Sequence, residues 1–168
     1  MCRRYEKLLG FVGDPIKVVN DTCFVSRGKR SVTIFRCGAE DLPWDDLADD
    51  FDCTFTSPPY FATELYAAGS EFEDDQSWKK FGEYESWRDN FFIPVSEHSY
   101  NSLKDGGYCM INILDPVVKG KRYRASDDLI DFMEAKYAKS FIGQIGMRYM
   151  QRAKKMESKD VSLHLFCS

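Results

Sequence analysis

The sequence lacks the features that mark membrane, secreted and zinc-binding proteins. No apolar run approaches the roughly 20 residues that a membrane-spanning helix needs, and the segment after Met1 has no apolar signal core. The six cysteines are scattered, without a CxxC or Cys/His spacing. We therefore expect no metal site, free thiols, and a protein of the cytoplasm or another reducing compartment that is not secreted.

Histidine is also scarce. Neither of the two residues, His98 and His164, has an acidic or nucleophilic neighbour at motif spacing, so we expect packing or surface roles for both. What is present is enough apolar material for one core, since 43% of the 168 residues are hydrophobic and 15% are aromatic. This composition excludes a disordered tail and a disulfide mini-protein, and it predicts a single domain over residues 1–168.

Charge is distributed unevenly along the chain. Residues 38–90 carry 3 Lys or Arg against 15 Asp or Glu, whereas 1–37 and 117–168 each have a net charge of +5. Proteins that bind nucleic acid non-specifically are usually basic overall, and this chain has a net charge of −4. Any contact with phosphates is therefore expected at the two basic ends.

Apolar, strand-like runs alternate with helical patterns. The runs are 8–12, 31–37, 51–56, 107–114, 141–149 and 161–167. Helical spacing covers 84–103, which Pro94 should interrupt, and a segment from Ser126, the expected N-cap, to about Lys139. Because the middle runs are nearly continuous, the pattern predicts an α/β fold with a mostly parallel sheet, closed by an antiparallel hairpin of the last two strands.

The segment FDCTFTSPPYFATELY, residues 51–66, carries the most specific chemistry. Ser57-Pro58-Pro59-Tyr60 follows an apolar run, and open α/β sheets bind ligands where their strands end. Two consecutive prolines make a rigid turn without N–H donors. The Ser57 hydroxyl and the Pro58 carbonyl could accept the hydrogens of a nucleobase amino group and stabilise charge on its nitrogen during alkylation. Tyr60 and Phe61 would contact the extruded base.

This motif resembles the (Asp/Asn/Ser)-Pro-Pro-Tyr motif of S-adenosylmethionine-dependent DNA amino-methyltransferases. Three further segments resemble the family in the same order: IFRCGAEDLPW at 34–44, LKDGGYCMINI at 103–113 and GQIGMRYMQRAKK at 143–155. The resemblance covers roughly residues 30–168. It implies a Rossmann-like methyltransferase sheet and transfer of a methyl group from S-adenosylmethionine to the exocyclic amino group of cytosine or adenine in DNA.

The resemblance also implies roles for single residues. Ser57, Pro58, Pro59 and Tyr60 would be catalytic, and Asp41, or Glu40 beside it, would lie near the cofactor adenine. Phe61 would contact the base, and basic residues of the last loop would contact DNA: Arg148, Arg152, Lys154 and Lys155. Serine before the prolines is more typical of the cytosine enzymes. RNA bases and the amide of a protein glutamine remain alternative substrates.

The chain departs from the family at its cofactor motif. Active members carry an Asp-x-Phe-x-Gly-x-Gly segment, and this sequence has none. The nearest candidate, LLGFVGDP, fits the second family strand better; its Asp14 would bind the cofactor ribose or belong to a plain Asp-Pro turn. The sheet would then be incomplete at its N-terminal side. A partner chain or a homodimer would complete it. A small split methyltransferase of this kind would suit a phage or large DNA virus. The alternative is a catalytically inactive methyltransferase-fold subunit that serves assembly or binding.

Overall fold

The computed structural model describes residues 17–19, 22–27, 30–63, 65, 68–147 and 161–167. The chain divides into two compact units, Met1–Leu42 and Pro43–Ser168, a division that the sequence alone did not indicate. Among the described residues, no helix has the length and apolar character needed to cross a lipid bilayer.

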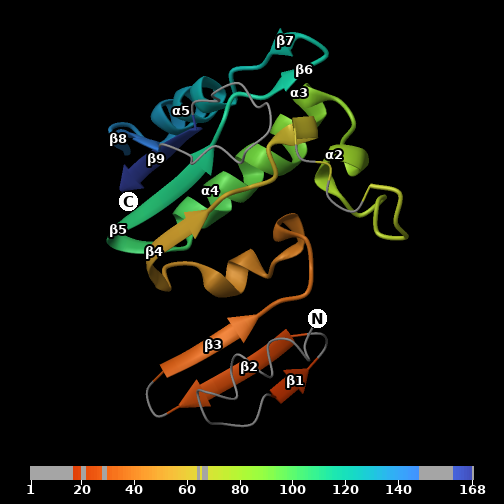
Figure 1. Ribbon diagram of the computed structural model, residues 1–168. Coiled ribbons are helices and arrows are strands. Elements are labelled where there is room, and N and C mark those ends of the chain that lie inside the picture. Colours follow the sequence, from red (N-terminus) through yellow and green to blue (C-terminus); the bar gives the residue numbers. More distant parts are fainter. Residues whose placement is uncertain are drawn as a thin grey trace. The chain divides into compact units, whose positions relative to one another are not determined.

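The first unit contains an antiparallel meander. Strands β1 (Lys17–Val19), β2 (Thr22–Arg27) and β3 (Arg30–Ile34) pair in sequence order, and the short 3-10 helix η1 (Ala39–Asp41) follows (Figure 1). The run predicted at 31–37 falls on β3, which ends three residues earlier than expected. The run predicted at 8–12 lies outside the described residues.

The second unit is built on a four-stranded sheet with the order β4-β5-β9-β8. Its strands are β4 (Phe51–Thr56), β5 (Leu103–Ile113), β8 (Phe141–Met147) and β9 (Val161–Cys167). The pair β4–β5 is parallel, and β9 pairs antiparallel with both β5 and β8. The α/β composition and the closing β8–β9 hairpin are confirmed. The mostly parallel sheet is wrong, because β9 inserts between two strands that run the opposite way.

Helices and short connections fill the rest of the second unit. They are η2 (Trp44–Leu47), η3 (Phe61–Thr63), α2 (Ser77–Lys80), α3 (Tyr84–Trp87), the π-helical turn η4 (Arg88–Phe92), α4 (Ile93–Asn101) and α5 (Ala125–Lys136). A small hairpin of β6 (Val117–Val118) and β7 (Lys121–Arg122) joins β5 to α5.

The segment expected to be helical over 84–103 is helical from Tyr84 to Asn101, and Pro94 does not break it. Pro94 lies in the first turn of α4. The π-helical turn η4 precedes it and continues the chain from α3. The expected N-cap at Ser126 is wrong: the helix begins at Ala125, and the Asp115 carboxylate accepts the Ser126 backbone N–H at 3.1 Å.

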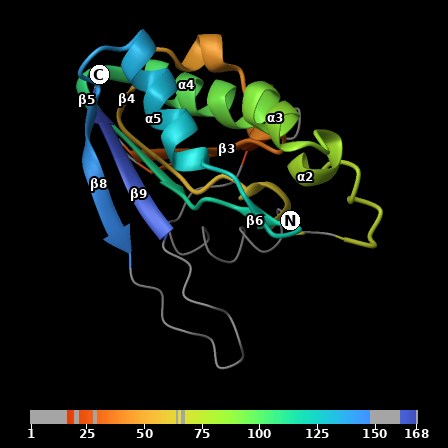
Figure 2. The same ribbon diagram turned by 90° about the horizontal axis from the view of Figure 1, so that it is seen from above.

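The sheet of the second unit has one covered face and one exposed face. Cys109, Ile111 and Ile113 are at most 1% exposed, and the Thr54 hydroxyl on the same face donates to the Ser99 carbonyl of α4. Figure 2 shows α4 and α5 on one side of this sheet. On the opposite face, large apolar side chains remain exposed: Phe55 at 62%, Tyr108 at 49% and Ile145 at 53%.

Candidate functional site

The Ser57–Tyr60 segment lies where the sequence predicts it, directly after β4. Thr56, the last residue of β4, pairs with Ile111 of β5, so the turn begins beside the end of that neighbouring strand. Two backbone bonds close the turn: the Phe61 N–H donates to the Pro59 carbonyl at 2.9 Å, and the Thr63 N–H donates to the Tyr60 carbonyl at 3.0 Å. The carboxyl edge of the β4–β5 pair therefore presents a short, closed turn.

The Ser57 hydroxyl has two polar neighbours. Its Oγ lies 2.8 Å from the Tyr60 hydroxyl, and either group can be the donor. The side-chain amide of Asn112, on β5, donates to the same Oγ at 3.4 Å. Asn112 is 4% exposed, so its amide is held in a buried position on the adjacent strand. Two side chains, one from the turn and one from β5, thus converge on one hydroxyl oxygen.

Sequence reasoning missed Asn112. The residue stands in a continuous apolar run, MINIL, where a lone asparagine breaks the pattern. That interruption is the one signal that marked it, because a buried amide needs hydrogen-bond partners. Its partner could not be found without the β4–β5 register, which sets Thr56 opposite Ile111 and so brings the next residues of both strands together.

Phe61 anchors the turn in an aromatic cluster. Its ring centroid lies 5.7 Å from those of Tyr84 and Trp87, and 6.0 Å from that of Tyr123. We use the name aromatic cluster for these four residues. Phe61 has a φ of 42°, a left-handed conformation that costs of order 1–3 kcal/mol for a residue with a bulky side chain. Packing of its ring in the cluster offsets that cost and holds the turn in place.

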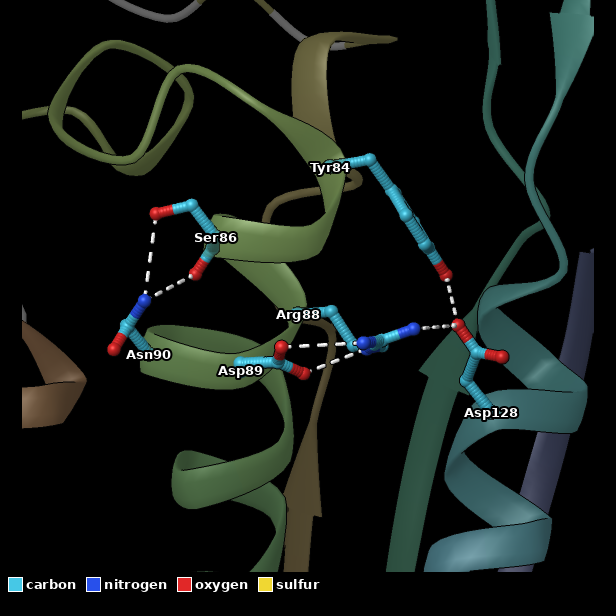
Figure 3. A network of polar contacts seen from close by, with 6 residues as sticks. All are labelled: Tyr84, Ser86, Arg88, Asp89, Asn90 and Asp128. Atoms are coloured by element: carbon cyan, nitrogen blue, oxygen red, sulfur yellow. Dashed lines mark hydrogen bonds and ion pairs between the residues drawn. The ribbon is translucent and has the colours of Figure 1, made fainter.

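A polar network ties the aromatic cluster to α5. The Tyr84 hydroxyl donates to the Asp128 carboxylate at 2.7 Å, and Arg88 reaches the same oxygen at 3.5 Å while it binds Asp89 (Figure 3). Burial raises the pKa of Tyr84, and the hydrogen bond to Asp128 raises it further. The Tyr84 hydroxyl therefore stays protonated and acts as a donor that joins α3 to α5.

The two aromatic residues of the motif are more enclosed than a base-stacking role suggests. Tyr60 is 6% exposed and Phe61 is 4% exposed. Pro58 is also buried, Pro59 is half-buried, and Ser57 is exposed. Of the expected catalytic residues, Ser57 is thus the one that offers its side chain to solvent. A base would meet the Ser57 hydroxyl at the surface of the turn, with Tyr60 behind it.

The expected cofactor residues belong to the first unit or lie outside the described residues. Glu40 and Asp41 lie in η1 of the first unit, close to Cys37. Burial raises the pKa of the Cys37 thiol, and the nearby carboxylates of Asp41 and Glu40 raise it further. Asp14 lies outside the described residues, and so do the expected DNA contacts Arg148, Arg152, Lys154 and Lys155.

Other titratable groups of the second unit have structural roles. His164 is fully buried on β9, which confirms the packing role expected for it, and burial lowers its pKa although Asp115 and Asp127 act in the opposite direction. Cys109 is buried, which raises the pKa of its thiol to about 11, whereas Cys53 is exposed. Within the described part of the chain, no three His, Cys, Asp or Glu residues are grouped to hold a metal ion.

An open cleft of about 330 Å³ lies apart from the turn. It is lined by Arg88, Asp89, Ile93, Asp128, Asp131 and Phe132, from η4, α4 and α5. None of the Ser57–Phe61 residues lines it, and its three carboxylates against one guanidinium make it unsuited to a phosphate. The cleft therefore adds nothing to the chemistry of the turn.

Comparison with known proteins gives no functional assignment for this chain. The chain matches no protein-family model and no curated protein sequence. The resemblance to DNA amino-methyltransferases therefore rests on the ordered sequence motifs alone.

Proposed function

We propose that this chain forms the base-facing side of a DNA amino-methyltransferase, with Ser57 as the acceptor for the exocyclic amino group of cytosine or adenine. The observation that carries the proposal is the placement of Ser57 at the carboxyl edge of β4, with Asn112 of β5 and Tyr60 both on its hydroxyl. The strand order, with the β8–β9 hairpin closing the sheet, is compatible with half of a Rossmann-like methyltransferase sheet.

The hydrogen-bond inventory of Ser57 gives the proposal a specific form. A serine hydroxyl has one donor and two acceptor sites. Asn112 fills one acceptor site, and Ser57 fills its donor site when it donates to Tyr60. The remaining lone pair then accepts an N–H of the target amino group. This favours a pyramidal nitrogen and stabilises the positive charge that develops there on alkylation.

The described residues do not form a cradle for S-adenosylmethionine at this edge. Gly120 is the first described glycine after the end of β5, and a Cβ there would meet open space. Gly107, where a Cβ would meet backbone at 3.0 Å, stands near the amino end of β5. The proposal therefore assigns the methyl-donor site to a partner chain, or to a second copy, and assigns recognition of the amino group to this chain.

A methyl-transfer assay tests the proposal. Labelled S-adenosylmethionine and DNA are supplied to the chain alone and with candidate partner chains that carry the glycine-rich strand. We expect transfer with a partner, and at least a tenfold loss in the Ser57→Ala and Tyr60→Phe variants, since one oxyanion-type contact is worth about 10²–10³ in rate. The Thr54→Val variant, changed on the opposite face of the same strand, should keep its activity. Equal transfer in all three variants would contradict the proposed role of Ser57.

A non-catalytic subunit is the second candidate, and the enclosure of Tyr60 favours it. With 6% of its surface exposed, Tyr60 has little ring area to stack on a base. The methyl-transfer assay with partner chains distinguishes the two, because neither candidate places the methyl-donor site in the isolated chain. Transfer in any pairing contradicts an assembly role, and no transfer in any pairing supports it.

A further inference from the structure

The hairpin β6–β7 lies beside the candidate site and carries a cluster of exposed basic residues. Residues 116–124, PVVKGKRYR, contain four basic residues and no acidic one. Lys119, Lys121 and Arg122 are exposed. Arg124 forms an ion pair with Asp127, so it is not part of the free charge of this hairpin.

The hairpin is a defined structure. Val117 pairs with Arg122 and Val118 with Lys121, and the two turn residues between them, Lys119 and Gly120, have φ values of 51° and 80°. Positive φ at both central positions is the mark of the tight turn that suits a two-residue hairpin. Lys119 is thereby held at the tip, although its own conformation is one that side chains other than glycine rarely adopt.

The hairpin is anchored to the same residues that hold the Ser57–Tyr60 turn. The Tyr123 N–H donates to the Pro116 carbonyl at 2.9 Å and closes the base of the hairpin. The Tyr123 ring stacks on Tyr84 at 4.3 Å and lies 6.0 Å from Phe61. Strand β6 also contacts η3, which begins at Phe61. The position of the basic side chains relative to Ser57 is therefore fixed through the aromatic cluster.

We propose that the β6–β7 hairpin binds the sugar-phosphate backbone of the DNA strand whose base reaches Ser57. The inference rests on the proposed function, because a nucleobase at Ser57 brings its own flanking phosphates to this edge of the sheet. Lys119, Lys121 and Arg122 form no ion pair within the described part of the chain, so their charge is available to phosphates. Lys121 lies 4.4 Å from the Tyr123 ring centroid, which orients it without neutralising it.

Contacts between the basic side chains of the hairpin and DNA phosphates should make binding depend on salt. The chain as a whole has a net charge of −4, so long-range attraction to DNA is weak, and binding depends on local contacts. Each phosphate neutralised by Lys or Arg releases counterions and adds about 0.9 to the slope of log affinity against log salt. Three contacting side chains would thus contribute about 2 to 3 to that slope.

Fluorescence anisotropy with a labelled DNA duplex, over about 50–200 mM salt, measures this contribution. The test variant is Lys119→Gln/Lys121→Gln/Arg122→Gln. The matched control is Lys104→Gln/Lys136→Gln/Lys139→Gln, which removes the same charge at the start of β5, at the end of α5 and between α5 and β8, away from the turn. We expect the slope to fall by about 2 to 3 in the test variant and to stay unchanged in the control.

A single Lys119→Gln variant keeps the test independent of folding, because Lys119 is an exposed residue at the tip of the hairpin. The salt slope of this variant should be lower than that of the wild type by about 1. The inference is overturned if the wild-type chain binds no duplex, if the slope is equal in all variants, or if the control loses as much as the test variant. The inference would also be overturned if the β6–β7 substitutions reduced the slope for binding of a stem-loop RNA but not for binding of DNA. A slope change without any methyl transfer would leave the inference intact and contradict the proposed function alone.

Discussion

At the scale of single residues, the candidate site depends on which way one hydroxyl donates. If Ser57 donates to Tyr60, its free lone pair faces a substrate as an acceptor. If Tyr60 donates to Ser57, both Ser57 lone pairs are used once Asn112 also donates, and Ser57 offers a hydrogen instead. The buried Asn112 amide is the constant partner in both arrangements, since it donates to Ser57 from the neighbouring strand.

The bond between Asn112 and Ser57 predicts an energetic coupling. In a double-mutant cycle of Ser57→Ala and Asn112→Leu, measured by urea unfolding, the two variants should couple by about 0.5–1 kcal/mol, because each removes the same hydrogen bond. The cycle of Ser57→Ala with Thr54→Val is the control. Thr54 faces α4 and shares no partner with Ser57, so the two effects should add within about 0.5 kcal/mol. Strict additivity in the first cycle would show that Asn112 does not hold Ser57.

At the scale of elements, what the sequence predicts well is local. The bounds of β4 and β9 agree with the expected runs 51–56 and 161–167, because short β-rich runs specify strands locally, although β4 is largely exposed. The helical spacing over 84–103 likewise predicts the run from Tyr84 to Asn101, although the expected interruption at Pro94 is absent. The N-terminus of α5 could not be predicted in this way, because the Ser126 backbone N–H donates to Asp115, eleven positions earlier in the sequence.

Non-local pairing explains the remaining differences. The position of the Ser57 turn could be predicted, since it needs β4 alone. Its contact with Asn112 could not, because that contact depends on the register between two strands about 50 residues apart. The insertion of β9 between β5 and β8 has the same origin: apolar runs indicate strands but carry no information about their order or direction.

The link between α3 and α5 gives a prediction for an element contact. Tyr84→Phe removes the hydroxyl that donates to Asp128 and leaves the ring of the aromatic cluster in place. A hydrogen bond to a charged group contributes about 1.5–3 kcal/mol, so the free energy of unfolding should fall by that amount. Asn90→Ala is the control from the same region: Asn90 is exposed and bonds only to Ser86 of the preceding turn in the network of Figure 3.

The free energy of unfolding of both variants, measured in urea, tests this prediction. We expect the Asn90→Ala variant to lie within about 0.5 kcal/mol of wild type, as do most surface substitutions. If Tyr84→Phe were equally neutral, the Asp128 contact would not hold α3 against α5. The aromatic packing around Phe61 would then have to fix the Ser57 turn by itself.

At the scale of the whole molecule, the described residues of the second unit leave apolar side chains exposed on one sheet face and leave one strand edge without a pairing strand. Among the described residues, β4 pairs with β5 on one side and with no strand on the other. Phe55 of β4 is 62% exposed, and Tyr108 and Ile145 continue the apolar surface over β5 and β8. Open edges and contiguous apolar surface favour association, and a doubly wound sheet normally covers both faces. This geometry agrees with the proposed need for a partner or a second copy.

We therefore expect the isolated chain to self-associate through this face, with a sedimentation coefficient that rises with protein concentration. Phe55→Lys places a charge on the apolar surface at the β4 edge and should shift the equilibrium to monomer. Phe72→Lys is the matched control: Phe72 is 52% exposed but stands in the segment between η3 and α2, away from the sheet. A monomer at every concentration, or equal effects of the two substitutions, would mean that the exposed sheet face does not drive association.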